Sequence, residues 1–194
     1  VYAKSFDFYW EDIGSPEKFL SANSDILSGK LKDCNIKRSE NYPEARIIPP
    51  CVIGKNCKIG KAEIGPFAVL GDRCIISDGA KIENSVLFDG AAVGKNAFLR
   101  GAVLCENSSV GEKTAAGEGS VIGKNTKVGK NSIVSAGTLL SGNCVFPDFS
   151  RLSGRLLSAV KNDGIIRGKI GFSGGLDDAL RWGYACGTVF DGNI

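Results

Sequence analysis

The feature that most constrains this chain is a sequence repeat with a period of six residues. In the segment VIGKNTKVGKNSIV, residues 121–134, Ile-Gly-Lys-Asn is followed six residues later by Val-Gly-Lys-Asn. A period of six matches neither the helical period of 3.6 nor the simple alternation of a hairpin strand. Any fold for this chain must therefore explain the repeat first.

The repeat runs through the middle of the chain in steps of six, with three steps of five. Sixteen of its eighteen positions are Ile, Leu or Val, and the exceptions are Ala116 and Phe146. The positions are 47, 53, 59, 64, 70, 76, 82, 87, 93, 99, 104, 110, 116, 122, 128, 134, 140 and 146. The residue two before each of them is always small: Ala, Cys, Ser or Thr. Because residues two apart in a strand point the same way, each unit is predicted to place one large and one small side chain inside.

Glycine follows the large inward residue in nine of these units, where a tight corner has little room for a side chain. Three strand-and-corner units then close one coil of 17 or 18 residues. This pattern resembles the hexapeptide repeat of the left-handed parallel β-helix. The resemblance implies an all-β core of about six triangular coils. From the residues on either side, we expect short helical segments to flank this core at both ends.

The bulk composition narrows the function classes. A formal net charge of +3 is too balanced to indicate a nucleic-acid or membrane-surface protein. The chain has no apolar run long enough for a transmembrane helix. Its seven cysteines are odd in number, and no secretory signal precedes them, so we expect reduced thiols and a cytoplasmic protein. Four of the seven occupy the small inward positions, where packing is their expected role; they are Cys51, Cys57, Cys74 and Cys144.

The chain contains no His and no Met. Many hexapeptide-repeat proteins are acyltransferases that use His as a general base, and some carbonic anhydrases on this scaffold bind zinc through His. The missing His disfavours both activities, so the β-helix is expected to serve as a scaffold and assembly surface. Because the first residue is not Met, we expect the chain to be a fragment of a longer protein.

A helix is predicted just before the repeat, because Ser15-Pro16-Glu17 is a good helix start and apolar residues recur at helical spacing up to Leu27. The stretch Tyr-Trp-Glu-Asp-Ile-Gly-Ser-Pro-Glu, residues 9–17, resembles the end of the catalytic domain in sugar-nucleotide pyrophosphorylases, such as mannose-1-phosphate guanylyltransferases. The resemblance implies that Asp12 helps to hold a catalytic magnesium ion, together with an earlier Asp upstream of Val1. One carboxylate does not fix a divalent cation, so no catalytic residue is assigned within this chain.

Two interpretations of the C-terminal flank stay open. Pro147-Asp148 is predicted to end the repeat, and residues 147–163 read as a polar linker. Residues 164–194 are expected to form a strand and a helix that cap the β-helix. Alternatively, Ile165-Ile166-Arg167-Gly168 and the segment 180–185 resemble the opening of a phosphohexomutase domain.

The predicted layout is a nucleotidyltransferase tail at 1–30, a linker at 31–44, the β-helix at 45–146, the second linker, and the C-terminal strand and helix. The resemblance implies a parent enzyme that converts a nucleoside triphosphate and a sugar 1-phosphate into an NDP-sugar and pyrophosphate, with magnesium. This chain alone is expected to be inactive. The alternative is a non-catalytic regulatory or assembly subunit, similar to related translation-factor subunits.

The residues just before the large inward positions are predicted to point outward. Two of the three outer faces mix charged and apolar residues, whereas the third presents an aliphatic residue in six successive coils. These residues are Val52, Val69, Val86, Val103, Val121 and Leu139. Such a stripe is unusual on a soluble monomer. We expect a second copy of the chain, or the catalytic domain with the 16–27 helix, to cover this face, and the sequence alone favours the homodimer.

Overall fold

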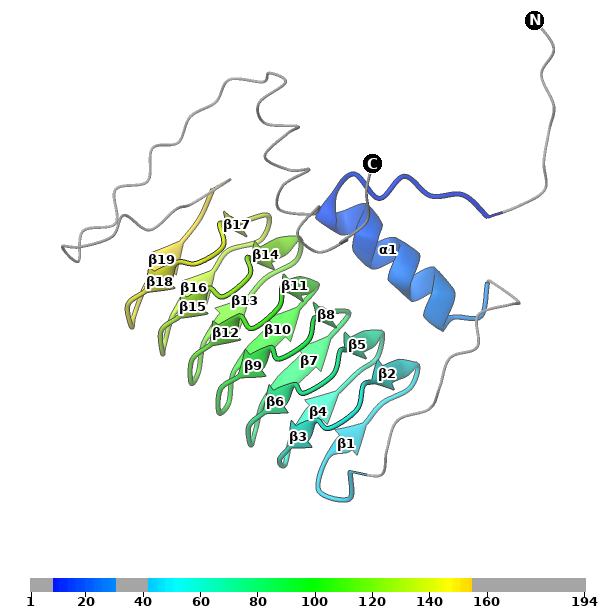
Figure 1. The fold of residues 1–194 in the computed structure, drawn as a ribbon, viewed down its shortest axis with the longest axis horizontal. Coiled ribbons are helices and arrows are strands. Elements are labelled where there is room, and N and C mark those ends of the chain that lie inside the picture. Colours follow the sequence, from blue (N-terminus) through cyan, green and yellow to red (C-terminus); the bar gives the residue numbers. More distant parts are fainter. Residues whose placement is uncertain (1–8, 31–41, 155–194) are drawn as a thin grey trace, which may run out of the picture.

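Strands of two or three residues follow one another from residue 46 to residue 152, as the six-residue repeat predicts. The structure is a computed structural model that describes residues 9–30 and 42–154. Within these residues the chain forms a parallel β-helix with one α-helix at its side (Figure 1). The predicted elements at 164–194 lie outside the described residues, as do 31–41 and 155–163 of the two predicted linkers.

Each strand pairs in parallel with the strand three further along the chain, which produces three sheets. Sheet A consists of β1 (Arg46–Ile47), β4 (Glu63–Ile64), β7 (Lys81–Glu83), β10 (Phe98–Arg100), β13 (Ala115–Ala116), β16 (Ile133–Val134) and β19 (Arg151–Leu152). Sheet B consists of β2 (Cys51–Ile53), β5 (Ala68–Leu70), β8 (Val86–Leu87), β11 (Ala102–Leu104), β14 (Ser120–Ile122) and β17 (Leu139–Leu140). Sheet C consists of β3 (Lys58–Ile59), β6 (Ile75–Ile76), β9 (Ala92–Val93), β12 (Ser109–Val110), β15 (Lys127–Val128) and β18 (Val145–Phe146). The predicted left-handed β-helix of about six coils is thereby confirmed.

The core is the column of large and small inward residues between the three sheets. All eighteen predicted large positions lie in strands, and sixteen of them are buried; Ile47 and Ile59, in the first coil, are half-buried. Hydroxyl groups in the small column bond to the backbone, either of their own coil or of a neighbouring one. For example, Thr126 Oγ1 donates to the carbonyl of Ser141 at 2.6 Å and accepts from the N–H of Cys144 at 3.2 Å. Small polar residues are thus accepted inside because their hydrogen bonds are satisfied.

The corners explain the repeated Gly-Lys-Asn sequence. At Gly123 a Cβ would lie 2.6 Å from the backbone of the next coil, so a side chain has no space there. Asn125 adopts a left-handed backbone conformation with φ of 56°, and Asn131 does the same with φ of 52°. Asn tolerates this conformation better than most residues. Each Gly-Lys-Asn is therefore one corner of the β-helix.

One strand lies beyond the predicted end of the repeat. The sequence interpretation ended the β-helix at Phe146, but β19 pairs with β16 and buries Leu152. Pro147 occupies the corner position that Gly129 holds one coil earlier, and Asp148 Oδ1 accepts the N–H of Lys130 at 2.7 Å. Proline has no N–H to donate, but the bond that joins this corner to the preceding coil is donated by Gly129 to the Phe146 carbonyl at 2.9 Å, so Pro147 leaves it intact and does not end the repeat.

The helix α1 (Pro16–Leu27) lies along sheet B (Figure 1). It starts as predicted, because the Ser15 side chain caps its first turn by accepting the N–H of Lys18 at 3.3 Å. The side chain of Leu20, on the side of the helix that faces sheet B, is buried. No helix in the described part of the chain has the length and hydrophobicity that a membrane span requires.

Candidate functional site

Asp12 lies in the turn that leads into α1. Its Oδ1 accepts the N–H of Gly14 at 3.0 Å, and its Oδ2 faces the Nζ of Lys18 at 3.4 Å. The Gly14 N–H, followed by Lys18, lowers the pKa of the Asp12 carboxyl below its usual value. The side chain is exposed, so these contacts shape the turn and add little stability.

The described residues do not complete a magnesium site around Asp12. Magnesium needs several oxygen ligands in near-octahedral geometry. Among residues 9–30 and 42–154, no group of three or more His, Cys, Asp or Glu side chains is arranged to hold a metal ion. The one carboxylate at this position is engaged with an amide and an ammonium group. Magnesium binding by Asp12 therefore stays a prediction that needs ligands from elsewhere.

The predicted aliphatic stripe forms the outer face of sheet B. Its six residues stand directly opposite one another in successive strands, as the sequence register predicts. The pairs are Val52 with Val69, Val69 with Val86, Val86 with Val103, Val103 with Val121, and Val121 with Leu139. This arrangement is a continuous apolar surface, which we call the valine face.

Helix α1 covers the middle of the valine face. Leu20 packs with Val86 and Val103, each of which is only 5% exposed. The ring of Phe19 stacks on that of Phe88, and Val69 and Val121 flank the cluster. Of the two coverings that the sequence left open, the structure places the 16–27 helix on this surface. The homodimer, which the sequence alone favoured, stays a prediction.

Two contacts fix the position of α1 over the corner between sheets A and B. Near the start of the helix, the Glu17 side chain lies against Gly119. A Cβ added to Gly119 would be only 2.5 Å from Glu17 Oε1. Near its end, Ser24 Oγ donates to Asn84 Oδ1 at 3.0 Å. The helix therefore runs against the direction in which the coils progress, from the coil of Gly119 back to that of Asn84.

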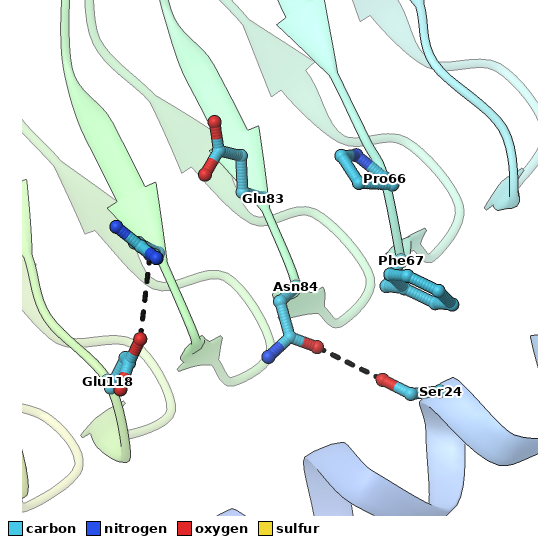
Figure 2. Close-up of a pocket in the computed structure, with 7 residues that line it drawn as sticks. Ser24, Pro66, Phe67, Glu83, Asn84 and Glu118 are labelled. Carbon is cyan, nitrogen blue, oxygen red and sulfur yellow. Dashed lines mark hydrogen bonds and ion pairs between the residues drawn. The ribbon is translucent and has the colours of Figure 1, made fainter.

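A hollow of about 320 Å³ lies beside this contact, where sheet A meets α1 (Figure 2). Four successive coils and the helix line it. The lining residues are Ser24, Pro66, Phe67, Glu83, Asn84, Arg100 and Glu118. Arg100 Nε and Glu118 Oε1 form an ion pair across it at 3.5 Å. The sequence reasoning missed this hollow entirely.

One sequence signal could have pointed to the hollow. A corner position with positive φ recurs in the A–B corners, and it is glycine in the later coils: Gly101, Gly119 and Gly137. Earlier in the chain the same position carries side chains, as Asn84 and Phe67. The change from side chains to glycine along one corner column marks where the surface changes shape.

Cys74 lies in the small inward column, as predicted, and is fully buried. Burial, assisted by the neighbouring Cys57 thiol, raises the pKa of Cys74 to about 12. Such a thiol is neutral at physiological pH and is a poor nucleophile. The packing role expected for this residue agrees with its surroundings.

The chain was compared with protein-family models, with curated proteins and with solved structures. A family model described as the GMPPB C-terminal domain matches residues 47–150. The acetyltransferase domain of PglB from Neisseria gonorrhoeae FA1090 is 21% identical with a TM-score of 0.47, and the match covers 53% of each chain. A hexapeptide transferase family protein from Anaplasma phagocytophilum is 22% identical with a TM-score of 0.31, and the match covers 75% of this chain and 81% of that one. The chain thus spans about half the length of the PglB domain. A comparison with curated proteins gave no match.

The fold and its repeat define a hexapeptide-repeat β-helix protein, related to the β-helix domain of sugar-nucleotide pyrophosphorylases. Within that class, the chain belongs to the GMPPB C-terminal domain family, whose match covers the β-helix from β1 to the turn before β19.

Proposed function

We propose that this chain is the C-terminal part of an enzyme that makes a nucleoside diphosphate sugar and pyrophosphate from a nucleoside triphosphate and a sugar 1-phosphate. The β-helix is its scaffold and assembly domain. The family match over residues 47–150 supports the relationship to sugar-nucleotide pyrophosphorylases. Fold likeness alone would not assign a reaction, so the proposal also rests on the segment in front of the helix.

The docking of α1 on the valine face is the observation that carries the proposal. The segment 9–17, which resembles the end of a nucleotidyltransferase domain, leads directly into this helix. Leu20 and Phe19 then fasten the helix to sheet B. A catalytic domain in front of residue 9 would thereby be held against the β-helix by a packed contact and not only by a linker.

In such an enzyme Asp12 would supply one carboxylate ligand to the magnesium ion. Magnesium would neutralise charge on the phosphates during nucleotidyl transfer. The remaining ligands and the contacts to the nucleotide and the sugar would come from residues outside this chain.

The partner proposed for the valine face is the catalytic domain, through α1. A homodimer would then have to use the parts of this face that the helix leaves accessible, near Val52, or another surface of the β-helix. Light scattering of the 194-residue chain distinguishes a dimer from a monomer.

The test uses the protein extended upstream of Val1 by its natural sequence. It is incubated with magnesium and a panel of nucleoside triphosphates and sugar 1-phosphates, and products are identified by mass spectrometry. The proposal predicts an NDP-sugar from at least one pair. A folded extended protein that yields no NDP-sugar from any pair would favour the non-catalytic regulatory subunit instead.

A further inference from the structure

The hollow between sheet A and α1 offers hydrogen-bonding groups of both kinds. Glu83 and Arg100 stand opposite each other in β7 and β10, and both project from the outer side of sheet A. Glu83 is half-buried, yet within the described residues its carboxylate accepts no hydrogen bond and forms no ion pair. Arg100 turns away from Glu83 towards the next coil, where its Nε lies 3.5 Å from Glu118 Oε1.

Asn84 adds a hydrogen-bonding group to the hollow, and Phe67 adds an aromatic ring. Asn84 uses its Oδ1 to accept from Ser24, and no described residue accepts from its Nδ2 group. The Phe67 ring lies on the other side of Asn84 from Glu118 and adds an apolar wall beside Pro66 (Figure 2). The backbone of Phe67 holds a φ of 58°, which is unusual for so large a residue. The hollow therefore combines free acceptors, free donors and one aromatic surface.

We propose that this hollow binds a neutral, hydroxyl-rich small molecule of the monosaccharide class. Each hydroxyl group of such a ligand donates one hydrogen bond and accepts others, so it can satisfy Glu83 and Asn84 together. The carbon-bound face of a sugar ring would lie against Phe67. The volume is at the lower end of the range for small-molecule sites, which suits a single sugar ring.

The charges of the hollow select against an anion. Its two carboxylates, Glu83 and Glu118, outnumber its one guanidinium group, so a phosphorylated sugar meets net repulsion. A simple cation is also a poorer match, because the Arg100 guanidinium and the Asn84 amide would face it as donors. A neutral polyol can form hydrogen bonds with the carboxylates, the guanidinium group and the amide alike. The site does not depend on a catalytic domain, because every lining residue belongs to the described chain.

The test is a nuclear magnetic resonance titration of the ¹⁵N-labelled 194-residue chain with D-mannose and with D-glucose. The backbone amides of Phe67, Asn84 and Arg100 are expected to shift in a saturable manner with at least one of these sugars. Glu83→Leu should weaken binding at least about tenfold, because a charge-assisted hydrogen bond is lost. Glu112→Leu is the matched control, since Glu112 is a partly exposed carboxylate at a different corner and pairs with Lys113 at 3.6 Å.

The spectrum of each variant reports its fold in the same experiment. If Glu83→Leu disturbs the fold, Arg100→Ala serves in its place, because the Arg100 side chain is 62% exposed. The proposal is overturned if neither sugar shifts these amides up to the solubility limit of the titration. It is also overturned if the variants of the hollow bind as well as Glu112→Leu, or if mannose 1-phosphate binds more tightly than mannose.

Discussion

The aromatic rings of Phe19 and Phe88 stack with centroids 6.2 Å apart and planes 14° from parallel. Phe19 belongs to α1 and Phe88 follows β8, so this contact joins the N-terminal flank to the β-helix. Offset stacked rings add stabilisation beyond the area they bury. Beside them Leu20 fills the space above Val86 and Val103, which makes this cluster the anchor of the helix.

Replacing Val86 and Val103 together by Glu should release α1 from the valine face. Two carboxylates at positions only 5% exposed cannot keep their hydration while the helix is docked. A free helix of 12 residues is marginal in water, so its amides should lose at least about tenfold of their protection in hydrogen exchange.

The matched control carries Glu at Ala92 and Ser109, which occupy the same outward positions on sheet C in the same coils. This control should keep both the helix protection and the β signal. Unchanged α1 protection in the valine variant would show that the helix is not held there. Light scattering of the wild-type chain tests the predicted homodimer separately, because α1 already covers Val86 and Val103.

Gly94→Ala should destabilise the β-helix more than Gly137→Ala. A Cβ at Gly94 would lie 2.5 Å from the backbone of the next coil, which cannot move aside without displacing a strand. We expect a loss of at least about 2 kcal/mol in the free energy of unfolding. Gly137 has a φ of 68° but no atom within 4 Å of its added Cβ, so only backbone strain of about 1 kcal/mol applies. Chemical denaturation measures the free energy of unfolding of both variants. Equal losses would show that the corner at Gly94 is not tightly packed.

Cys74 should resist alkylation in the folded chain. With a pKa of about 12, its thiol stays protonated through neutral and mildly alkaline pH and gains reactivity only as the pH rises towards that value. Iodoacetamide at pH 8, followed by peptide mapping, should leave Cys74 unmodified in the folded chain and modify it in denaturant. Equal labelling rates in the two states would show that this coil opens readily.

Much of the fold could be predicted because the repeat fixes which way each side chain points. The valine face was located to the residue, since a period of 17 or 18 residues sets the register of sheet B. The end of the repeat was misjudged because Pro147 reads as a break, although the bond to the preceding coil at this corner is donated by Gly129 and does not need an N–H on Pro147.

The hollow could not be predicted by the same reasoning. Its hydrogen bond between Ser24 and Asn84 joins residues 60 positions apart, across a segment with no repeat to carry the register. The position of α1 depends on a side-chain cluster around Leu20, and amphipathic spacing alone says only that the helix has an apolar side.

Asp12→Asn in the protein extended upstream of Val1 should lower turnover strongly while leaving the melting temperature nearly unchanged. The amide can still accept the Gly14 N–H, but it no longer offers a charged ligand to magnesium. Lys18→Ala is the control, because it removes the other partner of Asp12 without removing the carboxylate. Wild-type turnover in Asp12→Asn would exclude Asp12 from the metal site.

Release of pyrophosphate tests the central claim most directly, namely that this β-helix is the scaffold of a nucleotidyltransferase. The measurement compares the 194-residue chain with the naturally extended protein, each with magnesium, nucleoside triphosphate and sugar 1-phosphate. We expect release by the extended protein and none by the 194-residue chain. Release by the 194-residue chain alone would contradict the account, because it would place an active site among residues to which we assign only scaffolding.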